Sequence, residues 1–230
     1  MKHITAEKSQ KLLDILISNV QSYHVLLDSI EDEFTKQNIL RSIILFSCSG
    51  IDAVVKQLIL ETLDSVIARD VGAQEQLKSF IVRQLKKDSD FNYKLLADLL
   101  TKNNIRESLI TLLKNSLTFN SLQSPEQLFK VASFFNIKTA DLINNDKREI
   151  LSNAFAARNK IIHQMDVDLE KGTLDPITHT IDEVNGYYQV LVSLSQNFID
   201  EVNQTLKKEI TEDYTPIIVV NDGVLSIQDI

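Results

Sequence analysis

The sequence contains few of the residues that interrupt a helix. Among 230 residues there are five glycines and three prolines. Because glycine and proline are the usual signals that end a helix, their scarcity favours long helices and an all-α class. With 43% hydrophobic residues the chain is long enough to bury one sizeable core. We expect one helical domain over residues 1–212, followed by a short appendage over residues 213–230.

Other absences limit where the protein works and what it binds. A single cysteine, Cys48, excludes an intramolecular disulfide and a cysteine-based zinc cluster, and it fits a reducing cytoplasm. The N-terminus lacks the apolar core of a signal peptide, and no run looks long and uncharged enough to cross a bilayer. We therefore expect a soluble cytoplasmic protein with no membrane partner. The net charge of -8 gives no general support for nucleic-acid binding, so any contact with RNA has to be local.

Apolar residues recur at spacings of three and four along most of the chain, which predicts long antiparallel helices. The most apolar stretch is Ile39–Ile59, and its small residues at 47–50 allow another helix to approach closely. A turn is expected at residues 35–38, between the first two helices. The expected helices cover residues 5–34, 39–59, 74–87, 92–102, 105–117, 125–135, 139–143, 146–165 and 176–210.

Local signals mark one helix start and the tail. Ser124 suits an N-cap, Pro125 suits the first helical turn, and Gln127 is placed to close a capping box. In the tail, two β-branched runs flank residues 221–223, which read Asn-Asp-Gly and predict a small β-hairpin. An isolated hairpin is marginal in water, so we expect it to pack on the helices or on a partner chain.

A basic and polar patch interrupts the apolar pattern at Arg158, Asn159 and His163. Successive helical residues are rotated by about 100°, which puts Asn159 near 100° and His163 near 140° from Arg158, on one side of the helix. Asn159 and His163 are four residues apart, so the amide is expected to orient the imidazole. His163 also lies near the C-terminal end of the helix, where the helix dipole favours a protonated imidazole. A purely structural alternative is that these side chains cap and solvate the helix end, with Asn159 bonding a loop carbonyl.

Other polar residues have less specific patterns. Asp52 and Lys56 are four residues apart, and two interpretations stay open: a surface ion pair, or a polar notch in a buried helix. Cys48 has no basic cluster nearby in sequence and is expected to be a buried small hydrophobe. His24 is expected to be structural and His179 to lie at the surface. The sequence contains no phosphate-binding glycine loop, no Gly-x-Ser-x-Gly motif and no metal-ligand spacing, so we expect no metal and no cofactor.

Arg158, the polar Asn159 directly after it and His163 resemble the defining motif of the HEPN domains, in which an Arg is followed by a His after four to six residues. Residues 121–126, which read Ser-Leu-Gln-Ser-Pro-Glu, are similar to a segment of the RiboL-PSP type of HEPN protein. Asp52 and Lys56 lie where many members carry an acidic and a basic residue, although Asp replaces the more usual Glu. The resemblance covers roughly residues 39–203.

The resemblance implies a HEPN-like helical bundle that acts as a metal-independent endoribonuclease. Two copies would bring their motif helices together, so that each supplies Arg158 and His163 to one cleft. In that cleft His163 would transfer protons and Arg158 would hold the phosphate. Asn159 would orient His163, Lys56 and Lys160 would guide the RNA, and Asp52 would anchor Arg158 or His163.

Three functional hypotheses follow, and they differ in what the patch does. The first is a ribonuclease with a toxin or phage-defence role, acting as a homodimer on RNA and controlled by an antitoxin or another defence-system partner. The second is a non-catalytic HEPN-like module that binds RNA or a nucleotide and dimerises within a larger system. The third is a helical interaction protein that docks through the tail hairpin. The clustered Arg158, Asn159 and His163 favour the first, and the negative net charge favours the others.

Overall fold

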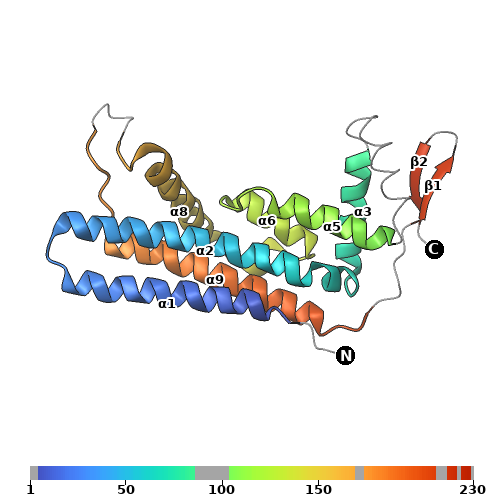
Figure 1. The fold of residues 1–230 in the computed structure, drawn as a ribbon, viewed down its shortest axis with the longest axis horizontal. Helices are drawn as coiled ribbons and strands as arrows, with labels where there is room; N and C mark the ends of the chain where they lie inside the picture. The colour runs from blue at the N-terminus through green and yellow to red at the C-terminus, as the bar shows by residue number, and fades with distance from the viewer. Residues whose placement is uncertain (1–4, 86–103, 169–173, 211–216, 222–223, 229–230) are drawn as a thin grey trace.

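Three long helices lie side by side and form the main layer of the fold (Figure 1). The computed structural model describes residues 5–85, 104–168, 174–210, 217–221 and 224–228. Helix α1 (Glu7–Ser29) turns directly into α2 (Glu33–Ile67), so the two are antiparallel, whereas α9 (Ile181–Leu206) runs in the same direction as α2. All three contribute buried apolar residues to one core. This layer is the platform on which the remaining helices pack.

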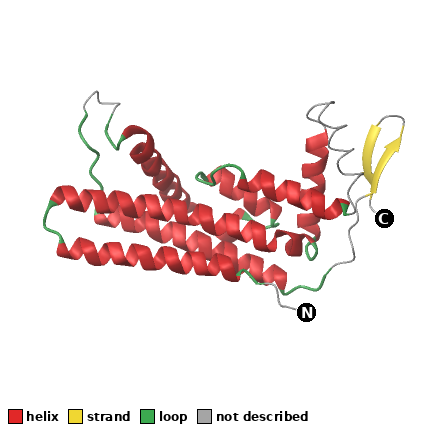
Figure 2. Ribbon diagram, viewed as in Figure 1, coloured by secondary structure: helices red, strands yellow, loops and turns green. Residues whose placement is uncertain are grey.

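Shorter helices cover the other side of α2 and α9. They are α3 (Val71–Leu85), α5 (Ile105–Thr118), α6 (Pro125–Phe134), α7 (Thr139–Leu142) and α8 (Asn145–Gln164). Helix α8 packs on α2 and α9 and then rises away from the layer at one end of the molecule (Figures 1 and 2). The all-α class predicted from the sequence is confirmed by these helices.

The tail carries two short strands at the position where the sequence predicts a hairpin. Strand β1 (Ile217–Asn221) pairs antiparallel with β2 (Val224–Gln228). The register joins Ile217 to Gln228 and Asn221 to Val224. The strands follow the helical layer in the chain.

Helix α2 is the central element because other helices pack on several of its sides. It contacts α1, α9, α5, α8 and α3. A Cβ atom added at Gly50 would lie 2.5 Å from Leu16 Cδ2 of α1, so the missing side chain allows a close approach there. Cys48 Sγ lies 3.7 Å from the carbonyl oxygen of Ala154 in α8. Small residues in the middle of α2 therefore admit two neighbouring helices, as the sequence predicts.

The expectation that no run is suited to crossing a bilayer needs correction. By length and composition alone, α2 is long and apolar enough to span a membrane. Half of the qualifying stretch is buried inside the bundle, and the core helix of a globular fold passes the same test. The contacts of α2 on several sides account for its apolar character.

The first turn lies earlier than the sequence predicts. Asp32 caps α2 by accepting a hydrogen bond from the backbone N–H of Thr35 at 2.8 Å, so residues 35–38 are helical. Phe34, expected in the core of the first helix, instead lies in the first turn of α2 and is 72% exposed. The error arose because the apolar spacing continues across the turn, whereas the cap at Asp32 breaks the helix.

Several other boundaries are close to those expected. Ser124 Oγ accepts from the N–H of Gln127 at 3.3 Å, which confirms it as the N-cap of α6. Gln127 Oε1 accepts from the N–H of Gln123, so the capping-box side chain bonds one residue before the cap. The last long helix starts at Ile181 rather than at Pro176, since Thr180 is its N-cap. The helix expected over residues 92–102 lies outside the described residues.

The central position of α2 predicts how it tolerates truncation of its leucines. Leu58 is fully buried, whereas Leu60, two residues away, is 51% exposed. We expect Leu58→Ala to lower the free energy of unfolding by about 2–5 kcal/mol. The same change at Leu60 should cost less than about 1 kcal/mol, since it leaves a smaller cavity. Urea unfolding of the purified protein without detergent measures both; equal losses would contradict the buried position of α2.

Candidate active site

Helix α8 presents one apolar face to the bundle and one polar face to solvent. It starts at Asn144, whose Oδ1 accepts from the N–H of Lys147 at 3.1 Å. Its buried residues are Leu151, Ala154, Phe155 and Ala157. Met165, which the sequence places in the core stripe, is 84% exposed because it is the C-cap and has a left-handed backbone conformation. The motif residues are therefore on the last two turns of a helix that its earlier turns anchor.

Arg158 is half-buried and its charge is not neutralised. Its Nη1 donates to Oδ1 of the neighbouring Asn159 at 2.9 Å, and its Nε is buried without a hydrogen-bond partner. Within the described part of the chain no carboxylate forms an ion pair with it. Several other cations do have such partners: Arg41 with Asp166, Lys56 with Asp52, Lys114 with Asp64, and Lys208 with Asp70. The guanidinium of Arg158 thus keeps unused donors and an uncompensated charge.

The sequence predicts that Asn159 orients His163, but in the structure Asn159 bonds Arg158 instead. Its amide oxygen accepts from Arg158, and a hydrogen bond to a cation is stronger than a neutral bond to an imidazole. His163 is exposed, and it has no hydrogen-bond partner among the residues that the structure describes. Arg158 lies against the α2 side of α8, close enough for its charge to act on Cys48. Arg158 is thus half-buried beside α2 while His163 is exposed, and within the described residues no hydrogen bond joins the two side chains.

Asp52 and Lys56 form a polar notch beside α6. Lys56 Nζ lies 3.0 Å from Asp52 Oδ2, and the two side chains are only 25% and 19% exposed. Asp52 Oδ1 also accepts from the backbone N–H of Leu122 at 2.6 Å. Of the two interpretations left open by the sequence, the notch is therefore the better description. Asp52 holds the segment that leads into α6, and no bond joins it to Arg158 or His163.

The remaining sequence candidates are separate from this pair. Lys160 is exposed on α8 and forms no ion pair within the described residues. His24 packs its ring edge against Tyr188, with 6.3 Å between ring centroids, which agrees with a structural role. In the described part of the chain, no group of three or more His, Cys, Asp or Glu side chains is placed to hold a metal ion.

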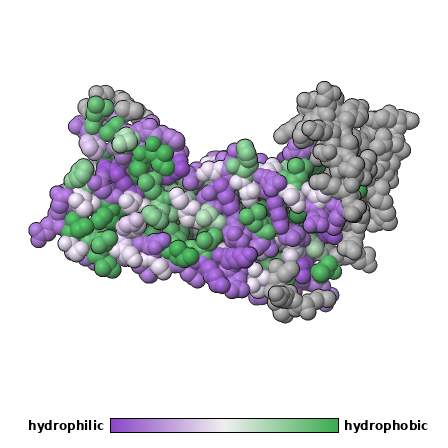
Figure 3. Space-filling model, in the orientation of Figure 1, coloured by the Kyte–Doolittle hydropathy of each residue, from purple (hydrophilic) through white to green (hydrophobic). Residues whose placement is uncertain are grey.

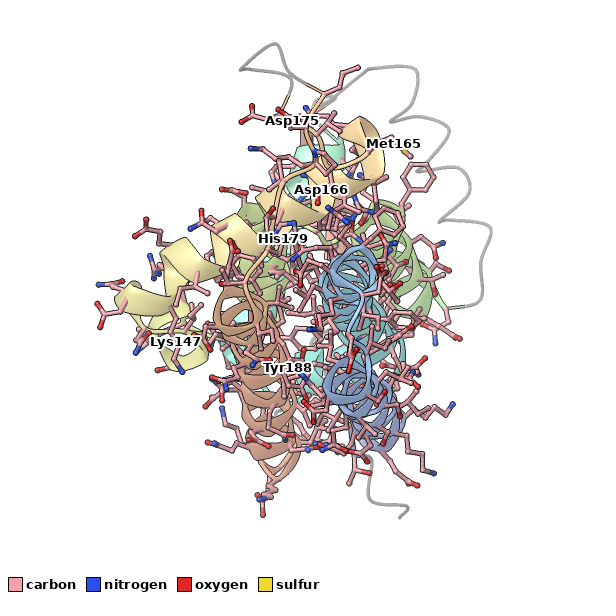
Figure 4. All side chains as sticks on the ribbon, turned by 90° about the vertical axis from the view of Figure 1, so that its left-hand side faces the viewer. Lys147, Met165, Asp166, Asp175, His179 and Tyr188 are labelled. Atoms are coloured by element: carbon pink, nitrogen blue, oxygen red, sulfur yellow. The ribbon has the colours of Figure 1, made fainter. Side chains whose placement is uncertain are left out.

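A buried charged cluster at the end of α8 was missed by the sequence analysis. Arg41 Nε lies 2.6 Å from Asp166 Oδ2, and His179 Nε2 lies 3.1 Å from the same oxygen. Figure 4 shows Asp166 and His179 close together at this end of the bundle, with Met165 on the outside. The prediction that His179 lies at the surface is wrong, since it is 5% exposed. The one signal in the sequence was Arg41, a cation within the most apolar stretch of the chain.

The surface near this end combines polar and apolar side chains. Figure 3 shows hydrophilic residues over much of the visible face, with apolar patches over the end where the α1–α2 turn lies. Ile162 and Met165, which flank His163 in sequence, are 46% and 84% exposed. The last turn of α8 and its C-cap thus expose two apolar side chains close to His163 in the sequence.

Comparison with known proteins gives one match. The family model described as RiboL-PSP-HEPN matches residues 7–204, which include all of α1, α2, α3, α5, α6, α7 and α8 and nearly all of α9. Searches of curated proteins and of solved structures gave no match.

Burial of Cys48 leads to a testable expectation about the neighbourhood of Arg158. Burial raises the pKa of the Cys48 thiol to about 12, although the nearby Arg158 charge acts in the opposite direction. Since only the thiolate is nucleophilic, the reactive fraction at pH 8 falls by about three orders of magnitude. We expect dithionitrobenzoate to react slowly with the native protein and to release one equivalent of chromophore in guanidinium chloride. Fast reaction of the native protein would show that α8 does not seal Cys48.

Proposed function

Because the chain belongs to the RiboL-PSP-HEPN family, we propose that it is a metal-independent endoribonuclease of the HEPN type. The proposed reaction takes place in a cleft shared by two copies of the chain, with Arg158 and His163 as catalytic residues. The proposed setting is the cytoplasm, in a toxin or phage-defence role with an antitoxin or another defence-system protein as partner.

The observation that carries this proposal is the unneutralised guanidinium of Arg158. A half-buried charge without a carboxylate partner is costly for the fold, so its retention favours a ligand of opposite charge. Guanidinium is planar and permanently charged, and it binds phosphate oxygens through paired hydrogen bonds. Arg158 is therefore suited to hold the scissile phosphate and to stabilise the extra charge of the phosphorane.

His163 is suited to the proton transfers of the same reaction. A ribose 2′-oxygen attacks the adjacent phosphorus while a base removes its proton, and the bond from phosphorus to the 5′-oxygen breaks as an acid protonates that oxygen. The products are a 2′,3′-cyclic phosphate and a free 5′-hydroxyl. Imidazole can act as acid or base near neutral pH.

In the proposed site a second copy of the chain supplies the groups that complete the cleft. Arg158 is half-buried with its charge close enough to act on Cys48 of α2, while His163 is exposed to a partner. Pairing of two α8 helices would place the His163 of one copy near the Arg158 of the other. It would also cover Ile162 and Met165, whose exposed apolar surface favours such a contact.

Local charges would have to offset the overall repulsion of RNA. The net charge is -8, so the chain as a whole repels a polyanion. Lys160 is exposed on the motif helix and has no carboxylate partner within the described residues, so we assign it a role in guiding RNA. Lys56 is a weaker candidate, since its charge is paired with Asp52.

A non-catalytic module that binds RNA or a nucleotide is the alternative, and one observation favours it. Asn159 bonds Arg158, so no described side chain fixes the imidazole of His163. A histidine without an orienting partner is a less effective acid or base. In this alternative Arg158 still binds phosphate, but the phosphodiester bond stays intact.

Substitution of the two motif residues tests the proposal. We expect the wild-type protein to cleave single-stranded RNA in the presence of EDTA. His163→Ala should slow cleavage by about 10²–10⁴-fold through loss of proton transfer. Arg158→Ala should slow it by about 10²–10³-fold through loss of charge stabilisation. The products are identified as 2′,3′-cyclic phosphates by mass spectrometry of a defined oligonucleotide.

Matched variants on the same helix serve as controls. Arg148→Ala removes another α8 arginine, which lies over the Phe129 ring, and Gln164→Ala changes the residue after His163. Both should cleave at nearly the wild-type rate. A wild type that retards RNA in a gel without cleaving it would favour the non-catalytic module. A strictly monomeric wild type in sedimentation experiments would contradict the shared cleft.

A further inference from the structure

The end of α8 has an unusual backbone conformation directly after His163. Met165 and Asp166 have φ angles of 54° and 57°. Both are in the left-handed region, which is unfavourable for side chains other than glycine and, to a lesser degree, asparagine and aspartate. Helices commonly end with one such residue, usually glycine. Two in succession without glycine persist only where surrounding contacts hold them in place.

The contacts that hold this end converge on the carboxylate of Asp166, which is 1% exposed. Its Oδ2 accepts a hydrogen bond from Arg41 Nε of α2 at 2.6 Å and lies 3.1 Å from His179 Nε2. An ionised carboxylate can only accept, so His179 donates from Nε2. The other side of the imidazole, Nδ1, lies 3.6 Å from Glu183 Oε2 of α9. The cluster thus joins the end of α8 to both long helices beneath it.

Hydrogen bonds of the backbone hold the same region from the segment that returns towards α9, residues 177–179. The N–H of Ile177 donates to the carbonyl of Asp166 at 2.7 Å, and Arg41 Nη2 donates to the carbonyl of Ile177 at 2.9 Å. Gln37 accepts from the N–H of His179 at 2.9 Å and donates to its carbonyl at 3.0 Å. The returning chain is therefore tied to α2 at two successive points.

This arrangement is poorly explained by stability alone. A buried ion cluster costs desolvation energy that its own attraction roughly offsets, and the two left-handed residues add strain. Asp166 Oδ1 and His179 Nδ1 are also buried without a hydrogen-bond partner. A glycine cap with apolar neighbours would end the helix at a lower cost. What the cluster provides is a fixed direction for the end of α8.

We infer that Arg41, Asp166 and His179 are positioning residues that set the place of His163 in the active cleft. His163 lies in the last turn of α8, three residues before Asp166 in the chain. The inference rests on the proposed function, because position matters only if His163 takes part in the reaction. A displacement of about 1 Å in a reacting group can cost about 10²-fold in rate.

The structure offers a control residue that distinguishes a role in positioning His163 from a role in stability alone. Asp70, at the opposite end of α2, is another buried aspartate. It accepts from Asn136 Nδ2 at 2.9 Å and from Lys208 Nζ at 3.0 Å. Asp70→Asn should destabilise the fold in much the same way as Asp166→Asn, but far from His163.

The test compares Asp166→Asn, His179→Leu and His179→Gln with Asp70→Asn. Asparagine tolerates a left-handed conformation, so the first variant removes the charge and keeps the backbone. Single-turnover cleavage at saturating RNA should fall about 10–100-fold in Asp166→Asn and His179→Leu. Their affinity for RNA should change less than about twofold, since Arg158 is intact. His179→Gln keeps a donor for Asp166 and should recover most of the rate.

Hydrogen exchange of the backbone amides of residues 163–166 supplies a readout that needs no cleavage. We expect faster exchange there in Asp166→Asn and His179→Leu, and unchanged exchange in Asp70→Asn. Wild-type rates in both cluster variants, or an equal loss in Asp70→Asn, would overturn the inference while the ribonuclease proposal stands. If the wild type does not cleave RNA, the proposed function fails. Hydrogen exchange then decides alone whether the cluster holds the end of α8. Unchanged exchange in Asp166→Asn and His179→Leu would overturn this holding role too.

Discussion

Burial of α2 is the constraint on which the rest of the structure depends. This helix is too apolar to face water, so α1, α9, α5 and α8 have to cover it on several sides. The small residues Cys48 and Gly50 decide how closely two of these helices approach. Because α8 packs on α2 through Ala154, the position of Arg158 one turn later is fixed by the core.

Arg158 and Arg69 differ from several other cations near the core, because no carboxylate within the described residues forms an ion pair with either of them. Arg41, Lys56 and Lys208 each meet a carboxylate; the pairs of Arg41 and Lys208 tie distant segments of the chain together, and that of Lys56 lies within α2. Arg158 ties nothing together beyond its neighbour Asn159. Arg69 spends one donor on the carbonyl of Ser65 in its own helix, whereas among the described residues Arg158 bonds only the exposed side chain of its neighbour, so an external anion would stabilise Arg158.

The sequence contained most of the fold but only part of the site. The scarcity of glycine and proline and the three-to-four spacing predicted the helices, and Ser124 with Gln127 predicted the start of α6. The start of α2 was misplaced because Asp32 is an N-cap inside a continuing apolar pattern. The Arg158, Asn159 and His163 patch was visible at helical spacing, whereas the partner of Asn159 depended on side-chain geometry. The Arg41–Asp166 pair joins residues far apart in sequence, for which no spacing rule exists.

The two ends of the bundle show how similar interactions can serve different purposes. Asp70 and Asp166 are both buried and paired with a cation, and each lies near a residue with positive φ. Around Asp70 the carboxylate also accepts the N–H of Ala73 at the start of α3, so it caps a helix and lowers the cost of its own burial. Around Asp166 the carboxylate caps no helix start, and one of its oxygens is buried without a donor. The burial of Asp166 therefore costs more free energy than the burial of Asp70. A site at this end that requires a fixed position for His163 accounts for that additional cost.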